Sequence, residues 1–316
     1  MHVISTGSRA LDALLLGGVR RGLLYCIFGA SGSGKTQLCM QLALNYARSS
    51  DRARVFIVDA KGDFRPERII EMYNAGMDKG AGSGGGRGGI GGGGGRGGID
   101  MERDGGGSSG KSSKYGNTYT RYSGDGDSAY YTDINTVMSI MDRIYVERAY
   151  HVDDIFNILS NIDSMYYRYD HGGVLFLIVE DSPSLFRLEY GSKSAEGHFR
   201  LMRLMHDLAL RAVLRNTAVI VTNGVTSSAR DGYGYVDSTT TTVAGSGMDE
   251  EEMQIMDRSV SMFAHFKVRL ERLSSRMVDG SMKGMDGSVF RAILLQPLAK
   301  NNTALFKIVE RGIVDI

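Results

Sequence analysis

The chain has 316 residues, 42% of them hydrophobic and 23% charged, which excludes a globally disordered protein. Its 37 Lys and Arg residues balance 36 Asp and Glu residues, so no overall basic character marks it as a nucleic-acid binder. Two cysteines, Cys26 and Cys39, cannot build a disulfide framework and favour a reducing compartment. The sequence contains neither an apolar run of bilayer length nor a secretory signal, so we expect no membrane association.

Glycine is concentrated in one stretch, because 22 of the 43 glycines lie between residues 76 and 126. We therefore predict one core over residues 1–76 and 127–316 and a glycine-rich disordered insert over residues 77–126. The insert also carries Gly-Arg-Gly repeats with Lys and Tyr residues. This composition fits a single-strand-binding segment and fits a plain tether equally well.

Apolar periodicity predicts alternating strands and helices. The predicted strands before the last third of the chain span residues 23–28, 55–58, 174–179 and 218–222. The predicted helices span residues 36–48, 66–74, 132–145, 153–165 and 198–214. This order favours an α/β fold with a mostly parallel sheet and helices on both faces.

The last third of the chain has a different pattern. Residues 266–273, 289–296 and 304–309 are predicted strands, and the connections between them are too short for crossover helices. We therefore expect an antiparallel C-terminal extension of the sheet. The polar stretch 227–257 is predicted to be a long mobile loop.

Residues 29–36, GASGSGKT, match the phosphate-loop pattern G-x-x-x-x-G-K-[ST] between a predicted strand and a predicted helix. In such a loop, backbone N–H groups and the helix N-terminus surround an anion. Lys35 is expected to reach the β- and γ-phosphates of ATP, and Thr36 to place its hydroxyl on Mg²⁺. The predicted nucleotide-binding residues are Gly29, Ser31, Gly32, Ser33, Gly34, Lys35 and Thr36.

A metal-binding carboxylate is expected at the end of a neighbouring strand. Glu180 and Asp181 follow the apolar run 174–179 directly. Successive strand residues point to opposite faces, so the sequence leaves open which of the two would join Thr36 at Mg²⁺. A solvated strand end carrying two acids is the alternative.

Further motifs lie in order along the chain. They occupy residues 5–18 (STGSRALDALLLGG), 62–68 (GDFRPER), 182–189 (SPSLFRLE), 222–223 (TN) and 304–313 (ALFKIVERGI). Together with the phosphate loop they resemble the RecA-type recombinases of archaea and eukaryotes, the RadA/RadB group and their paralogs. The resemblance implies a RecA-type P-loop NTPase core. Because the sequence starts directly at that core, we expect a short, RadB-like paralog rather than a self-sufficient filament former.

Two positions depart from the family pattern, and they leave the catalytic residues unknown. Lys61 stands where the family has a glutamate that positions water, and Gly224 stands where it has a glutamine that senses the γ-phosphate. We predict ATP binding with slow or absent hydrolysis, since an ammonium cannot accept a proton from water. Asp59 or Asp63 could substitute in part, and Lys61 could instead be a plain loop lysine.

The resemblance also implies contacts with adenine and DNA. Arg68 would lie over the adenine, although a helix-surface arginine is the alternative. A first DNA-binding loop would use Lys193, Arg200 and Arg203. A second loop would use Arg230, although the acidic residues 249–252 would repel a phosphate backbone.

These features predict an ATP- and Mg²⁺-binding RecA-fold paralog that assists homologous recombination and DNA repair. Its expected partners are DNA, single-stranded above all, and a principal recombinase or another paralog, with oligomers possible. It is expected in the cytoplasm at the nucleoid, or in a nucleus. The alternatives are an active DNA-dependent ATPase that catalyses strand exchange and a RecA-fold signalling ATPase that does not involve DNA.

Overall fold

The computed structural model describes residues 3–77, 128–168, 175–191, 194–224, 260, 262–273, 288–299 and 302–316. The predicted insert, apart from Met77, and the predicted loop 227–257 lie outside these residues. Within the described part, no helix is both long and apolar enough to cross a membrane.

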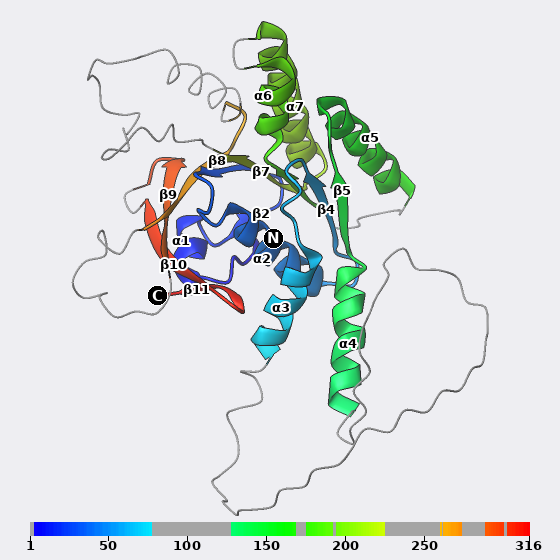
Figure 1. The fold of residues 1–316 in the computed structure, drawn as a ribbon, viewed down its shortest axis with the longest axis vertical. Helices are drawn as coiled ribbons and strands as arrows, with labels where there is room; N and C mark the ends of the chain where they lie inside the picture. Colours follow the sequence, from blue (N-terminus) through cyan, green and yellow to red (C-terminus); the bar gives the residue numbers. More distant parts are fainter. Residues whose placement is uncertain are drawn as a thin grey trace, which may run out of the picture.

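The described residues form a nine-stranded mixed sheet with the strand order β11-β10-β9-β8-β3-β7-β6-β4-β5 (Figure 1). A separate two-stranded antiparallel sheet pairs β1 (Val3–Ile4) with β2 (Val19–Arg20). Its parallel part consists of β3 (Leu24–Gly29), β7 (Ala218–Gly224), β6 (Leu175–Glu180), β4 (Arg54–Asp59) and β5 (Ile144–Arg148). The central strands are buried on both faces, which explains their continuous apolar sequences. The predicted mostly parallel sheet is therefore confirmed.

The other side of the sheet consists of β8 (Phe266–Arg272), β9 (Val289–Gln296), β10 (Thr303–Val309) and β11 (Gly312–Asp315). Strands β9, β10 and β11 are antiparallel to their neighbours, as predicted. Strand β8 corrects the prediction, because it pairs parallel with β3 on one edge and antiparallel with β9 on the other. It is the strand at which the sheet changes from parallel to antiparallel.

Strand β5 was missed by the sequence analysis, which extended a helix over residues 132–145. Helix α4 (Ser128–Met141) ends at Met141, and Ile144 begins the edge strand that pairs parallel with β4. Ile140, Met141, Ile144 and Tyr145 continue a helical apolar period, so periodicity alone cannot separate the two elements. Pairing with β4 and stacking of Tyr145 on Phe56, with ring centroids 4.9 Å apart, decide for the strand.

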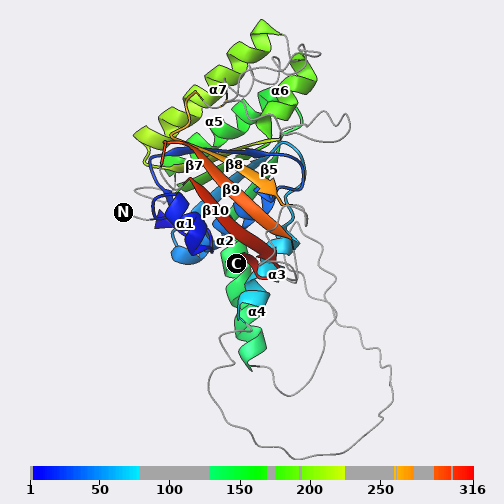
Figure 2. The same cartoon turned by 90° about the vertical axis from the view of Figure 1, so that its left-hand side faces the viewer.

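Helices cover both faces of the sheet (Figure 2). One face carries α1 (Arg9–Leu14), α2 (Lys35–Ser49), α3 (Pro66–Met77) and α4, and the other carries α5 (Val152–Arg168), α6 (Ser182–Tyr190) and α7 (Ala195–Leu214). Side chains alternate along each strand, so Tyr25 and Ile27 of β3 enter the first core while Leu24 and Cys26 enter the second. This arrangement confirms an α/β fold with helices on both faces.

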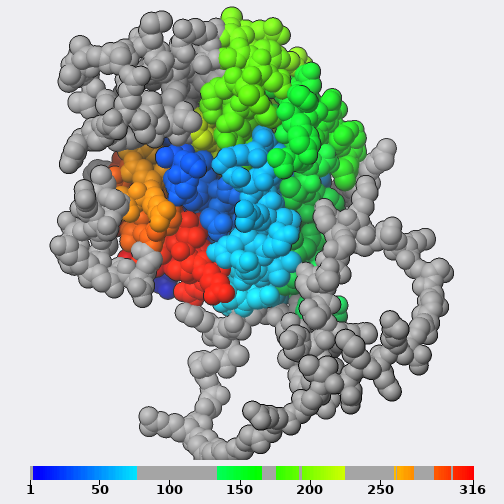
Figure 3. Space-filling view, viewed as in Figure 1, coloured from blue at the N-terminus to red at the C-terminus, as the bar shows by residue number. Residues whose placement is uncertain are grey.

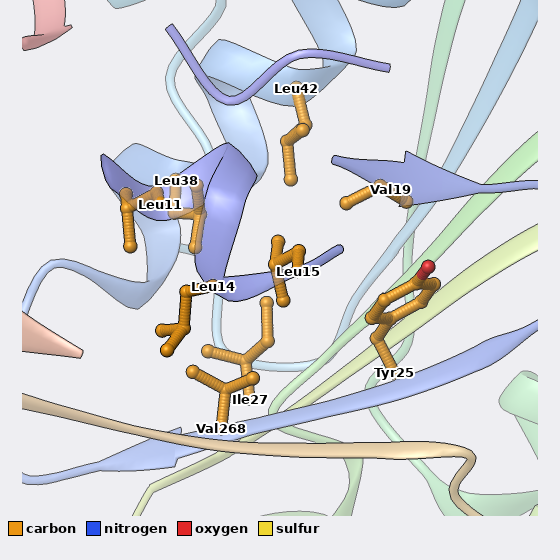
Figure 4. A pocket seen from close by; sticks show the side chains of 9 residues that line it. All are labelled: Leu11, Leu14, Leu15, Val19, Tyr25, Ile27, Leu38, Leu42 and Val268. Atoms are coloured by element: carbon orange, nitrogen blue, oxygen red, sulfur yellow. The ribbon is translucent and has the colours of Figure 1, made fainter. Parts of the chain in front are cut away.

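The N-terminal segment packs α1 and β2 (Val19–Arg20) over β3 (Figure 4). The side chains in this view enclose an apolar cavity of about 10 Å³. Its lining residues are Leu11, Leu14, Leu15, Val19, Tyr25, Ile27, Leu38, Leu42 and Val268. An apolar space of this size stays dry. We therefore assign it to core packing, not to a ligand.

The two ends of the chain meet at α1. Asp315, at the end of β11, accepts hydrogen bonds from Ser8 Oγ at 2.5 Å, Arg9 N at 3.2 Å and Ala10 N at 3.1 Å. These bonds hold the pKa of Asp315 below its ordinary value, with the Ser8 bond as the largest cause. The carboxylate satisfies N–H groups that the first turn of a helix leaves unpaired. The C-terminal strands are thereby fastened to the N-terminal segment.

Candidate functional site

The candidate site lies where four parallel strands end. Gly29 and Gly224, the last residues of β3 and β7, are register partners, and Asp59 and Glu180 are register partners at the ends of β4 and β6. The carboxyl ends of parallel strands lie at the same edge of a sheet, which is where ligands bind in open α/β folds. Four of the predicted motifs, residues 29–36, 62–68, 182–189 and 222–223, therefore meet at one edge.

The loop between β3 and α2 brings the start of α2 to this edge. Gly32 and Gly34 have φ values of 76° and 93°, a left-handed backbone that glycine adopts without strain. A Cβ atom on Gly34 would also lie 2.8 Å from Ile308 Cδ1. Gly34 gives the start of α2 no side-chain cap, which leaves N–H groups of the first turn available to an anion.

Lys35 and Ser33 are two of the polar side chains of this turn. Lys35 Nζ folds back and donates to Gly29 O at 2.7 Å and to Ala30 O at 2.9 Å. Burial lowers the pKa of Lys35, and the nearby Asp181 carboxylate opposes this shift. Ser33 Oγ is buried without a hydrogen-bond partner among the described residues. The loop thus holds a partly desolvated ammonium and an unused hydroxyl next to the helix N-terminus.

Glu180 is the buried carboxylate that faces α2. Thr36 Oγ1 donates a hydrogen bond to Glu180 Oε1, while Oε2 is buried and lacks a partner in the described part of the chain. The pKa of Glu180 is raised to about 7, mainly by burial and also by the charges of Asp59, Asp63 and Asp181, while the hydrogen bond from Thr36 lowers it. An unpartnered carboxylate oxygen beside a threonine hydroxyl is a suitable donor set for Mg²⁺, a hard cation that takes oxygen ligands.

Asp181 has different contacts. Its backbone is left-handed, with φ 50°, and its N–H donates to Thr222 Oγ1 at 2.9 Å. Its Oδ1 accepts the N–H of Gly224 at 2.9 Å. The chain therefore turns Asp181 toward β7 and leaves Glu180 against Thr36. Of the two acids that the sequence left open, Glu180 is the one in contact with Thr36.

Asp59 organises the loop that carries Lys61. One carboxylate oxygen accepts the N–H of Lys61 at 3.1 Å and of Gly62 at 2.6 Å, and the other accepts the N–H of Phe64 at 3.2 Å. Lys61 Nζ forms an ion pair with Asp63, and this bond raises the pKa of Lys61. Both acids that could have substituted for a catalytic glutamate are thus engaged within the loop.

Arg68 connects three elements instead of projecting freely from α3. It donates to Gln37 Oε1 at 3.0 Å, Glu71 Oε2 at 3.1 Å and Val309 O at 2.7 Å. Figure 3 shows the surface of α3 adjoining that of the C-terminal strands. The predicted adenine contact of Arg68 stays a prediction, and the structure gives this guanidinium a role in joining α2, α3 and β10.

Arg187 was not singled out from the sequence, although it lies in the motif at residues 182–189. Its guanidinium donates to Ser184 Oγ at 2.9 Å, Gly224 O at 3.2 Å and Asn223 Oδ1 at 3.4 Å. It therefore holds the end of β7 to the start of α6. Its spacing of three residues from Ser184 on a helix was the available signal.

The predicted DNA contacts are only partly described, since Lys193 and Arg230 lie outside the described residues. Arg200 bonds to the Asp153 carboxylate and to the Tyr190 hydroxyl. Arg200 and Arg203 also lie over the ring of Phe156, at 5.6 and 5.8 Å from its centroid. The structure thus brings the two arginines together at α5, with the charge of Arg200 partly neutralised by Asp153.

A mostly parallel mixed sheet with helices on both faces fits an α/β RecA-like fold. Residues 1–80 match the family model of Rad51. The matched segment runs from the N-terminus through α3 and contains both the loop before α2 and the loop that carries Lys61. The match supports a relationship with the RecA- and Rad51-type recombinases.

Replacing Glu180 with Gln tests its buried charge. The carboxyl group ionises near pH 4.5 in the unfolded chain but near pH 7 in the folded chain. Ionisation therefore costs the folded state free energy as the pH rises through this window. In the absence of nucleotide and metal, the free energy of unfolding of the wild type should fall relative to E180Q between pH 4.5 and 7, by on the order of 2–3 kcal/mol. Urea unfolding across that range measures the difference, and parallel curves for the two proteins would contradict the prediction.

Proposed function

We propose that the chain is an ATP-binding RecA-fold paralog, RadB-like, that assists homologous recombination and DNA repair by binding DNA, a principal recombinase or both. The observation that carries the proposal is the contact of Thr36 with Glu180, whose second oxygen is buried without a described partner. This contact would supply a hydroxyl and a carboxylate to a metal ion bound with a nucleotide at the N-terminus of α2. The match to the Rad51 family model supports the assignment to recombination and repair.

Nucleotide binding would rearrange a few contacts. Lys35 would exchange the carbonyl oxygens of Gly29 and Ala30 for phosphate oxygens, which carry more negative charge. Thr36 and Glu180 would hold Mg²⁺, which neutralises phosphate charge when bound. The N–H groups at the start of α2 would donate to the phosphates. Lys35 can exchange its two bonds to backbone carbonyls, and Glu180 has an oxygen without a partner among the described residues.

Among its described residues, the same site lacks the groups for fast hydrolysis. Lys61 cannot accept a proton from water, and Asp59 spends both carboxylate oxygens on the backbone of its own loop. Gly224 offers no side chain to a γ-phosphate, and its N–H is bonded to Asp181. We therefore propose that the chain binds ATP well and hydrolyses it slowly.

The first test is the thermal stability of the wild type and K35A with and without ATP and Mg²⁺. Ligand binding to the folded state raises the melting temperature by mass action. We expect this rise in the wild type and its loss in K35A, because the phosphate cation is removed. R52A, which removes an exposed cation in the turn before β4, is the matched control and should keep the rise. An equal rise in wild type and K35A would contradict the role of Lys35.

The second test restores the residues that the family has at the two divergent positions. A Cβ atom at residue 224 would lie 3.2 Å from Asp181 Oδ1, so a glutamine there requires Asp181 to shift by a few tenths of an ångström. The double variant K61E/G224Q should recover part of the ~10²–10⁴-fold that general-base assistance contributes. The two single variants are the controls and should recover less, since such groups act as a unit. Fast ATP turnover by the wild type, unchanged in K61E, would favour the active DNA-dependent ATPase instead.

The third test is a titration with single-stranded DNA, with and without ATP, at two salt concentrations. Binding should weaken as salt rises, because protein cations displace counterions from the phosphates. The R203A variant removes an exposed guanidinium of α7, which lies over Phe156 of α5, and should reduce the salt dependence by about one contact. Absence of binding at both salt concentrations would favour a RecA-fold signalling ATPase.

A further inference from the structure

The backbone of the Lys61 loop is fixed from several sides. Asp59 accepts N–H bonds from Lys61 and Gly62 on one side of the loop. Ala60 N donates to Glu180 O of β6 at 3.2 Å, and Ala149 N, just after β5, donates to Asp59 O at 3.1 Å. The base of the Lys61 side chain is thus held at the edge of the sheet, one strand away from Glu180.

The side chain of Lys61, in contrast, is free to change partners. It is 46% exposed, and its ion-pair partner Asp63 is 45% exposed on the same loop. Exposed ion pairs are weak, because water competes for both charges and two side chains must be held in place. A ligand with more charge than a single carboxylate can therefore take the ammonium from Asp63.

Lys61 also belongs electrostatically to the candidate site. Its ammonium interacts with the carboxylates of Asp181 and Glu180. It also acts on Lys35, whose pKa it helps to lower. Lys35 is bound by the carbonyls of its own loop, whereas Lys61 approaches from the loop after β4. The site thus has one cation, Lys35, at the start of α2 and a second, Lys61, on the loop between β4 and α3.

We propose that Lys61 binds the terminal phosphate of a nucleoside triphosphate, exchanging Asp63 for it, so that the chain binds triphosphates in preference to diphosphates. This inference rests on the proposed nucleotide binding and gives Lys61 a positive role there. Lys35 and the start of α2 would hold the phosphates from one side, and Lys61 would reach the terminal phosphate from the β4–α3 loop. A phosphate–ammonium bond is stronger than the exposed bond that it replaces.

The test compares dissociation constants for Mg²⁺–ADP and for Mg²⁺ with the non-hydrolysable β,γ-imido analogue of ATP, measured by calorimetry. The variant K61M keeps a long apolar side chain and removes the charge. We expect K61M to bind the triphosphate analogue about tenfold more weakly, as expected for the loss of one charge-assisted bond. Binding of ADP should stay within about twofold, because ADP lacks the phosphate that Lys61 contacts.

Two further variants separate this role from a structural one. D63N frees the ammonium and should strengthen triphosphate binding without changing ADP binding. R65A removes another exposed cation from the same loop and should leave both constants unchanged. The inference is overturned if K61M leaves the ratio of the two constants unchanged, or if D63N weakens triphosphate binding as K61M does. A wild type that binds neither nucleotide would overturn the proposed function itself.

Discussion

A buried carboxylate at the first turn of α2 is the constraint around which the site is arranged. Glu180 lies at the end of β6, between β7 and β4, where its pKa is raised by burial and its bond to Thr36 offsets part of that cost. Such a group destabilises the folded chain when ionised, unless a cation balances it. Asp59, Asp63 and Asp181 lie nearby and add negative charge, which increases the stabilisation that a bound cation would give.

Two neighbouring loops each bring one positively charged side chain near these carboxylates. The glycine backbone before α2 brings Lys35, and the Asp59 carboxylate fixes the loop that brings Lys61. Asp181 is turned away and holds the end of β7, where Arg187 adds two further bonds and a third to Ser184 of α6. Within the described part of the chain, cationic side chains and unpaired polar atoms therefore gather at this edge, while Asp59, an acid that could activate water, is engaged by its own loop. This division underlies the proposal of nucleotide binding with slow hydrolysis.

The C-terminal strands support the same site from the other half of the sheet. Arg68 joins α2 and α3 to the end of β10, Ile308 lies against Gly34, and Asp315 caps α1. The contacts made by β10 and β11 join residues more than 200 positions apart, so the loop before α2 depends on the last strands of the chain for its support. A change in β10 or β11 can thus reach the candidate site through packing alone.

The sequence alone determined the parts that local patterns encode. The apolar runs predicted the central strands, and the spacing of glycines before Lys35 predicted the loop at the end of β3, because both depend on neighbouring residues. It could not choose between Glu180 and Asp181, since that choice depends on β7 drawing Asp181 away. Nor could it recognise β5, whose apolar residues continue the period of α4 until pairing with β4 makes them a strand. The sequence likewise could not predict the hydrogen bonds of Asp59 or the ion pair of Asp63, because the three-dimensional path of the backbone sets these partners.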